Sequence, residues 1–277
     1  MNNIIVSEQD FLNTYKIKTF GHKALKKCKK YNWLPLRSSQ HLSSIVGHLM
    51  GDGNLSKNRM VGDFRFYGDS SKLNRILYDL KNYFNLMPYA YYKHPKGGGY
   101  ILRYNNAIFA RILELMGVPR GDKILTAFRV PKWIINNNKK IKKSFLSALL
   151  TDEMSKINKN KRGQWKGFWF SMSKIKSKTN HLVYFLDQIR DLLNEFEITS
   201  SEVRVRKKHS YYRKDGNITY PAFFCIHTNF LNRKRFYFNI GFENKQKQKL
   251  LYKSIKNDFT VCGSAGDLKT GIWKKSQ

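Results

Sequence analysis

The chain has 277 residues, and its 52 lysines and arginines outnumber 19 aspartates and glutamates, which gives a formal net charge of +33 at pH 7. A content of 41% hydrophobic and 14% aromatic residues excludes a disordered basic tail, because this composition can bury a core. Such charge on a folded chain favours a polyanionic partner, nucleic acid before an anionic membrane. A lysine-rich proteome is the alternative explanation of the excess.

The cysteines and the hydropathy pattern further narrow the class of protein. Cys28, Cys225 and Cys262 lie far apart and form no C-x-x-C pair, so a zinc ribbon or disulfide framework is not expected. No run of 18 apolar residues occurs, and the N-terminus lacks a basic region followed by an apolar one. We expect an intracellular protein, in the cytoplasm or in an organelle matrix if organelle-encoded, with no membrane partner.

Residues 1–40 form a basic N-terminal extension. The pattern predicts two short helices, broken near Gly21 and stopped before Pro35. A helix-turn-helix is one interpretation, although short basic amphipathic helices are common.

From residue 41 the pattern changes to alternating helices and strands. An apolar helix with Leu42, Ile45, Val46 and Leu49 on one face ends at Gly51-Asp52-Gly53. Strand periodicity at 61–71, a helix at 72–86, a hairpin around the glycines at 97–99 and a helix from 106 follow. Residues 41–137 therefore predict the order helix, strands, helix, strands, helix.

The same order recurs in residues 138–257, before a tail at 258–277. A second apolar helix ends at Asp152 and Glu153, and a strand, a helix, a hairpin near Asp215-Gly216 and closing helices follow. Asp52 and Glu153 are 153 − 52 = 101 residues apart, which fits a half-protein repeat. The sequence thus predicts an α+β fold made of two similar mixed halves.

An acidic residue at the end of an apolar helix needs a reason, because carboxylates prefer helix N-termini. A bound divalent cation is one explanation, since Mg²⁺ prefers a few carboxylates together with water and phosphate oxygens. A solvated helix end is the alternative for either acid alone, but the recurrence of Asp52 and Glu153 at matching places favours the cation.

These residues carry a resemblance. IVGHLMGDG at 45–53 and LSALLTDEM at 146–154 resemble the two nonapeptides of the LAGLIDADG homing endonucleases, of the single-chain type with two motifs. Gly47 and Ala148 stand at the close-packing position, and Met154 replaces the terminal glycine. Segments 117–123, 129–134 and 240–251 resemble the ends of the two repeats, so the likeness covers roughly 41–256.

The resemblance implies two pseudo-symmetric αββαββα halves whose saddle-shaped antiparallel sheets lie in the DNA major groove. It implies a monomeric, intron-encoded or free-standing nuclease that cuts both strands of a long, specific DNA site with Mg²⁺, for which Mn²⁺ or Ca²⁺ can substitute in binding. Asp52 and Glu153 are then the catalytic metal ligands. By local match, Lys123 and Lys245 are the catalytic cations near the scissile phosphates.

Basic and polar side chains are dense on the strand segments, where acids are scarce, as a groove-facing surface requires. The predicted DNA-binding residues are Asn54, Ser56, Lys57, Arg59, Arg65, Lys93, Lys96, Arg103, Lys159, Lys161, Arg162, Lys166, Arg204, Arg206, Lys208 and Arg213.

The competing hypothesis is a binder without catalysis, such as a group I intron RNA maturase with intron RNA as partner, or a DNA-binding protein whose second site has decayed. Ala148 and Met154 are consistent with decay. Retention of both acids favours the enzyme, because a pure binder has no electrostatic reason to keep them beside phosphates. An intein is disfavoured, because neither end shows a Cys or Ser start with a His-Asn terminus.

Overall fold

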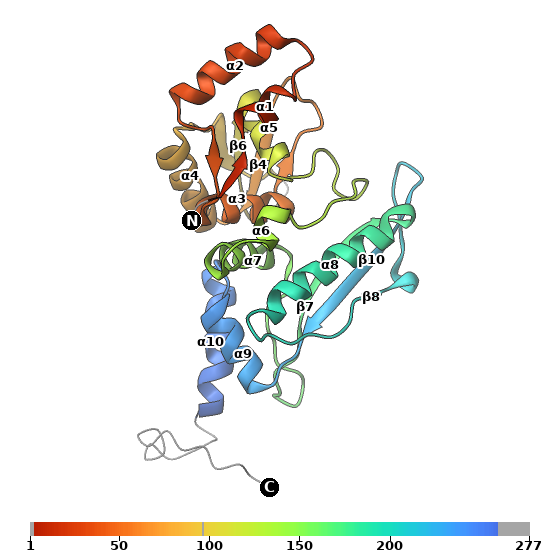
Figure 1. Ribbon diagram of the computed structural model, residues 1–277. Helices are drawn as coiled ribbons and strands as arrows, with labels where there is room; N and C mark the ends of the chain where they lie inside the picture. The colour runs from red at the N-terminus through yellow and green to blue at the C-terminus, as the bar shows by residue number, and fades with distance from the viewer. Residues whose placement is uncertain (1–2, 96, 260–277) are drawn as a thin grey trace.

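The computed structural model describes residues 3–95 and 97–259 (Figure 1). Its elements form an N-terminal extension followed by two groups that repeat one order. The predicted contact Lys96 and nearly all of the predicted tail at 258–277 lie outside the described residues.

The extension contains β1 (Ile4–Val6), α1 (Glu8–Leu12), α2 (Lys18–Lys30) and β2 (Leu36–Arg37). The predicted helix break near Gly21 is wrong, because Gly21 lies inside α2. A Cβ at Gly21 would lie 3.3 Å from the Tyr15 Cβ, so the glycine allows α2 to pack against the segment before it. Strand β1 pairs antiparallel with β2 and ties the two ends of the extension together.

The first group has the order helix, two strands, helix, two strands, helix. Its elements are α3 (Gln40–Met50), β3 (Asn54–Leu55), β4 (Asp63–Gly68), α4 (Ser70–Phe84), β5 (Ala90–Lys93), β6 (Tyr100–Asn105), α5 (Ala107–Leu115) and the short α6 (Lys132–Ile135). The strands form one antiparallel sheet in the order β3-β4-β6-β5. The hairpin predicted at the glycines closes between β5 and β6, where the Gly99 carbonyl accepts a hydrogen bond from the His94 amide at 2.8 Å.

The second group follows the same plan with strands of unequal length. Its elements are α7 (Lys139–Glu153), β7 (Phe168–Ile175), the 3₁₀ turn η1 (Lys176–Lys178), α8 (Thr179–Asn194), β8 (Arg204–Val205), the 3₁₀ turn η2 (Lys207–His209), β9 (Tyr211–Tyr212), β10 (Ile218–Ile226), α9 (Phe230–Asn239) and α10 (Lys245–Phe259). Strand β10 pairs antiparallel with β7, β8 and β9. The mixed α+β class with antiparallel sheets is therefore confirmed.

Strand periodicity sets which face of each sheet is buried. In β4, Phe64 and Phe66 are fully buried against the helices, whereas Arg65 and Tyr67 lie on the outer face. In β7, Phe168 and Phe170 are buried while Trp169 is 40% exposed. Each sheet therefore presents one face to the core and leaves the other open.

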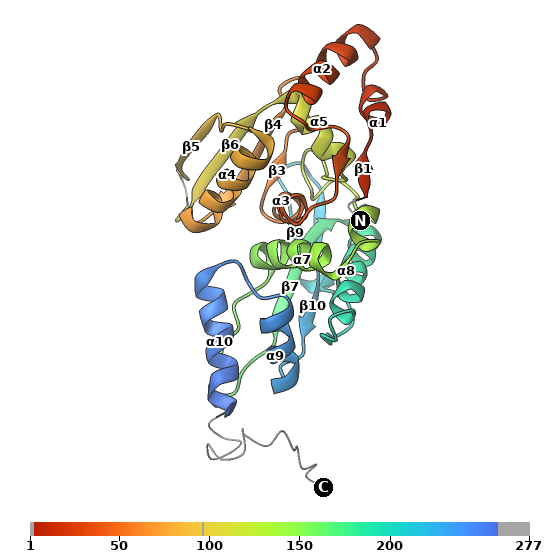
Figure 2. The same ribbon diagram turned by 60° about the vertical axis from the view of Figure 1, so that its left-hand side comes forward.

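Helices α3 and α7 lie side by side in the middle of the molecule and join the two groups, as both views show (Figures 1 and 2). A Cβ on Gly47 would lie 2.7 Å from the Phe145 carbonyl oxygen and 2.9 Å from the Ala148 Cβ. Only a glycine permits this approach without a shift of the backbone. Both helices run to the same end of the contact, and this brings their C-terminal residues together.

Candidate active site at the ends of two helices

The acids predicted from the two nonapeptides lie where α3 and α7 end. Asp52 follows Gly51, the residue that caps α3, and Glu153 is the last residue of α7. The backbone amide of Asp52 lies 3.4 Å from the Asp152 carboxylate, so the two helix ends are in contact. The carbonyl ends of both helices add to the negative potential, because no intrahelical donor satisfies them.

The acids resist ionisation at this place. Partial burial, and then the charge of Asp152, raise the pKa of Asp52 above its ordinary value. Burial raises the pKa of Glu153 to about 7, with Lys123 opposing the shift and Asp52 adding to it. Carboxylates crowded in this way favour a bound cation, since a cation restores their charged form.

Two lysines cover the carbonyl ends of the helices in matching ways. The Lys123 ammonium lies 3.4 Å from the Leu49 carbonyl oxygen and 3.3 Å from that of Met50, at the end of α3. The Lys247 ammonium donates to the carbonyls of Thr151, at 2.6 Å, and Met154, at 2.5 Å, at the end of α7. Burial lowers the pKa of both lysines. Met50 and Thr151 hold the sixth place in their nonapeptides, so each lysine contacts the carbonyl at that equivalent position.

The structure does not bring Lys245 to this site. Lys245 is exposed at the first residue of α10, whereas Lys247 lies one half-turn further and faces the end of α7. The family resemblance at 240–251 falls on a lysine-rich segment, so the sequence alone could not distinguish Lys245 from Lys247. The direction of α10 makes the distinction.

A buried ionic network that no sequence pattern predicted supports the helix ends. The two ring nitrogens of His48 lie 3.0 Å from the Asp152 carboxylate and 2.7 Å from that of Glu243. The Lys72 ammonium donates to Asp152 and lies 3.9 Å from Asp52. His48 and the Asp152 side chain are each 1% exposed. The signals available in the sequence were a histidine within an apolar helix and a second acid beside Glu153.

This network determines the charge of its members. Burial lowers the pKa of His48, but Asp152 and Glu243 together raise it above its ordinary value. Burial raises the pKa of Asp152, and His48 and Lys72 outweigh that effect, so its pKa lies below the ordinary range. Asp152 is therefore an ionised, paired carboxylate, unlike its neighbour Glu153.

The donor set fits a hard, oxygen-seeking ion. Asp52 and Glu153 supply carboxylate oxygens, and both nitrogens of the adjacent His48 are already engaged. In the described part of the chain, no group of three or more histidine, cysteine or acidic side chains is arranged to hold a metal. Two carboxylates that leave the other positions to water and phosphate are the arrangement that Mg²⁺ prefers.

The predicted DNA contacts fall into three sets. Arg65 and Arg103 share the carboxylate of Asp63 on the outer face of the first sheet. Arg59 pairs with Glu114, and Arg213 pairs with Asp122 and Asp215. The remaining described members lie in short strands, in loops or in the 3₁₀ turn η2, with partly or fully exposed side chains: Asn54, Ser56, Lys57, Lys93, Lys159, Lys161, Arg162, Lys166, Arg204, Arg206 and Lys208.

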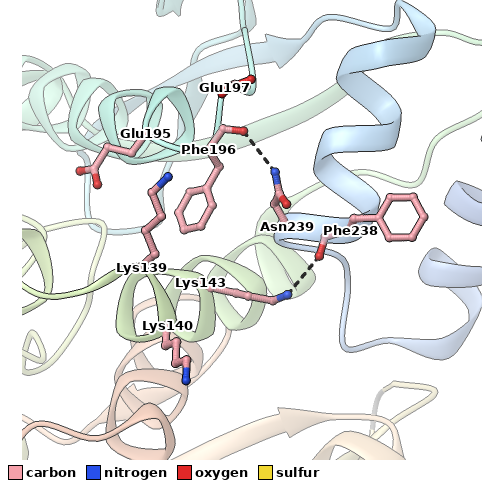
Figure 3. Close-up of a pocket in the computed structure, with 8 residues that line it drawn as sticks. All are labelled: Lys139, Lys140, Lys143, Glu195, Phe196, Glu197, Phe238 and Asn239. Carbon is pink, nitrogen blue, oxygen red and sulfur yellow. Dashed lines mark hydrogen bonds between the residues drawn. The ribbon is translucent and has the colours of Figure 1, made fainter. Parts of the chain in front are cut away.

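A separate hollow lies near the beginning of α7, away from the acids (Figure 3). Lys139, Lys140 and Lys143 line it together with Glu195 and Glu197, and the Lys143 ammonium donates to the Phe238 carbonyl at 3.1 Å. Its lining therefore carries both signs of charge. It is not part of the site at the helix ends.

Among the described helices, none has the length and apolar content needed to span a bilayer.

No protein-family model matches the chain. Among curated proteins, it is 29% identical over 277 residues to the DNA-directed RNA polymerase subunit Rpo1N of Methanocaldococcus jannaschii, a match that covers 90% of this chain and 20% of that protein. It is 26% identical over 262 residues to the tRNA-splicing ligase RtcB of Methanopyrus kandleri, covering 89% of this chain and 25% of that protein. The chain thus spans a fifth to a quarter of the length of these relatives.

Solved structures similar to this chain include two homing endonucleases. I-WcaI bound to its DNA recognition sequence matches with a TM-score of 0.48 and 15% identity, covering 89% of this chain and 98% of that one. Mesophilic variants of I-DmoI match with a TM-score of 0.44 and 15% identity, covering 73% of this chain and 88% of that one.

Proposed function

We propose that this protein is a divalent-metal-dependent, sequence-specific DNA endonuclease of the LAGLIDADG type. One observation carries the proposal: two tightly packed helices end side by side, and each end combines an acid, Asp52 or Glu153, with a lysine, Lys123 or Lys247, at equivalent places. A pair of equivalent acid and lysine groups suits two equivalent reactions. The two strands of a DNA duplex supply two such substrates.

Each group has a defined role in this proposal. Asp52 and Glu153 would hold Mg²⁺ at the helix ends, and the ion would supply a Lewis acid that polarises a scissile phosphate and promotes ionisation of water. The ammonium groups of Lys123 and Lys247 lie at the same ends, where they stabilise the charge that develops on the phosphate or polarise the attacking water. Lys72 neutralises Asp152, so that this third acid does not repel the substrate.

The partner in the proposal is double-stranded DNA. The net charge of +33 and the open outer faces of the two sheets support it. The lysines and arginines of the strands and loops bind the DNA phosphates, and the sheet faces contact the base edges.

The curated relatives add a second point. Rpo1N and RtcB carry unrelated names, yet the same stretch of this chain matches a fifth to a quarter of each. We infer that the shared segment is a module carried within such proteins, because neither named activity can belong to a segment common to both.

The test is selection of cleaved sites from a randomised duplex library with Mg²⁺, followed by assay of a supercoiled plasmid carrying the selected site. We expect the wild type to linearise it. Asp52→Asn and Glu153→Gln should each abolish cleavage and leave affinity within about tenfold, because an amide keeps the shape but loses the charge that attracts the ion. Asp191→Asn, which removes an exposed acid from α8, is the matched control and should cleave normally.

Each alternative has its own outcome. A binder or maturase would select sites, or bind intron RNA, without cutting. Cleavage by both amide variants would place the metal elsewhere. Binding whose affinity does not change with salt would exclude a nucleic-acid partner, since each phosphate contact should lower log K by about 0.9 per log unit of salt.

A further inference from the structure

The outer faces of the two sheets differ in chemistry. In the first sheet, Arg65 of β4 and Arg103 of β6 are direct partners across the strands, and Asp63 lies two residues before Arg65 on the same face. In the second sheet, Trp169 and Phe223 lie on the outer side; Trp169 is exposed, whereas Phe223 is buried, with the Arg206 guanidinium 4.0 Å from its ring centroid. Strands β7, β8, β9 and β10 contain no acidic residue.

Asp63 holds both arginines of the first sheet. One carboxylate oxygen accepts from the Arg65 Nε at 2.9 Å and from its Nη2, and the other accepts from the Arg103 Nε at 2.8 Å. The Asp63 side chain is 8% exposed beneath side chains that are 33% and 29% exposed. The guanidinium of Arg103 also lies 5.2 Å from the Tyr89 ring centroid. Two flexible side chains are thereby restrained from below.

The contacts of Asp63 with Arg65 and Arg103, called the clamp below, leave guanidinium donors free to face outward. Asp63 uses only the Nε of Arg103, and within the described residues no acceptor binds the two Nη groups of that side chain. A guanidinium presents donors in a rigid fork that matches the O6 and N7 acceptors of guanine in the major groove. A flexible, unclamped arginine would serve a phosphate equally well, so the clamp adds orientation rather than affinity.

An acid on a DNA-facing sheet otherwise lowers affinity. Asp63 repels phosphates, and exposed ion pairs add little to stability. Burial alone would raise the pKa of Asp63, but its bonds to Arg65 and Arg103 hold it below the ordinary value. The carboxylate is therefore charged at neutral pH, and its role must outweigh that repulsion.

We propose that Asp63 is a positioning residue that fixes Arg65 and Arg103 to read guanine, and that only the half-site beneath the first sheet carries this preference. The inference rests on the proposed function. Residues directly opposed on antiparallel strands lie about 5 Å apart, and stacked bases about 3.4 Å apart, so the two guanines are at neighbouring positions, one or two steps from each other. The half-site beneath Trp169 and Phe223 lacks the guanine pair.

The test is selection of bound sites from a randomised duplex library, with Ca²⁺ present, using the full chain. The wild type should enrich guanine at two neighbouring positions in one half-site. Asp63→Asn should lose about tenfold or more of the preference for guanine at both positions, while its affinity for random DNA stays equal or increases. Arg103→Gln, a change at a part-exposed side chain, should lose the preference at one position only.

Arg206→Gln on the second sheet is the matched control, and it should leave the guanine preference intact. A single cooperative urea-unfolding transition with a midpoint close to that of the wild type shows that each variant is folded. The inference is overturned if the wild type enriches no guanine pair, or if Asp63→Asn keeps the full preference. Failure of the wild type to bind any duplex would instead overturn the proposed function.

Discussion

At the end of α3 the Asp52 side chain is 49% exposed, whereas at the end of α7 the Asp152 side chain is 1% exposed and burial raises the pKa of Glu153 to about 7. The two lysines at these ends nevertheless make the same type of contact with helix carbonyls. Each half therefore places an acid and a lysine, the groups of the proposed chemistry, at the end of its central helix. They differ in the residues that surround those groups and in the outer faces of their sheets.

This comparison shows which constraints are shared. Helices that pack at their glycine and alanine positions must match each other, because the contact between them is mutual. Among the described residues, the outer sheet faces do not contact each other and so have no such constraint; under the proposed function each would face a different part of the DNA. Divergence concentrates there, with Asp63 and its arginines in one half and Trp169 and Phe223 in the other.

Removal of the lysine at one helix end is the change with the largest expected effect on the equivalence of the two ends. Lys247→Met should lower the single-turnover cleavage rate about a hundredfold, as loss of a group that stabilises transition-state charge does. Lys123→Met should act similarly at the other helix end. Lys245→Met, two residues away and exposed, is the control and should change the rate less than twofold. An equal loss in the Lys245 and Lys247 variants would remove the second lysine from the site.

Close packing of the two helices can be tested next. Gly47→Ala should destabilise the fold by about 1–3 kcal/mol, because the added Cβ would lie 2.7 Å from the Phe145 carbonyl oxygen. Adding Ala148→Gly should recover part of the loss by removing the contact at 2.9 Å. The midpoint and slope of urea unfolding measure both effects. Wild-type stability in the single variant would show that the helices can separate without cost.

A contact between the halves gives a smaller effect. Lys174 of β7 is fully buried, and its ammonium donates to the carbonyls of Lys123 and Thr126, both at 2.5 Å. Lys174→Met should release the loop that carries Lys123 and lower the cleavage rate about tenfold, with DNA affinity unchanged. Lys176→Met, an exposed neighbour, is the control. A loss of affinity equal to the loss of rate would contradict this positioning role.

The smallest expected effect concerns pH and the asymmetry of the acids. The folded-state pKa of Glu153, about 7, lies above the ordinary 4.5, so the folded protein holds this proton more tightly than the unfolded chain does. Without metal, the stability contributed by protonated Glu153 is complete below pH 4.5 and decreases as the pH rises to about 7. Glu153→Gln should lack this decrease.

Thermal unfolding of both proteins without metal, between pH 5 and pH 8, measures the difference. We expect the melting temperature of the wild type to fall relative to that of Glu153→Gln across this range, and added Mg²⁺ to reduce the difference at pH 8. Parallel curves would show that Glu153 is already ionised at pH 5.

Local patterns were sufficient to predict several parts of the molecule. The apolar periodicity of α3 and α7, the recurrence of their acids and the glycine hairpin predicted a mixed α+β fold of two similar halves. These features depend on neighbours within a few residues, and the sequence records such neighbours directly. The position of Gly47 also indicated a close helix contact before any partner was known.

Tertiary structure alone decided which lysine reaches the second helix end and which acids are paired. Lys245 and Lys247 are both lysines of the same lysine-rich segment. Only the direction of α10 relative to α7 determines that Lys247 reaches the end of α7. His48, Asp152 and Glu243 come from segments up to 195 residues apart, and their charges depend on burial that no local pattern encodes. The sequence determined where acids and apolar helices occur, because periodicity is local. Packing determined which of them meet, because contacts between distant segments depend on the whole fold.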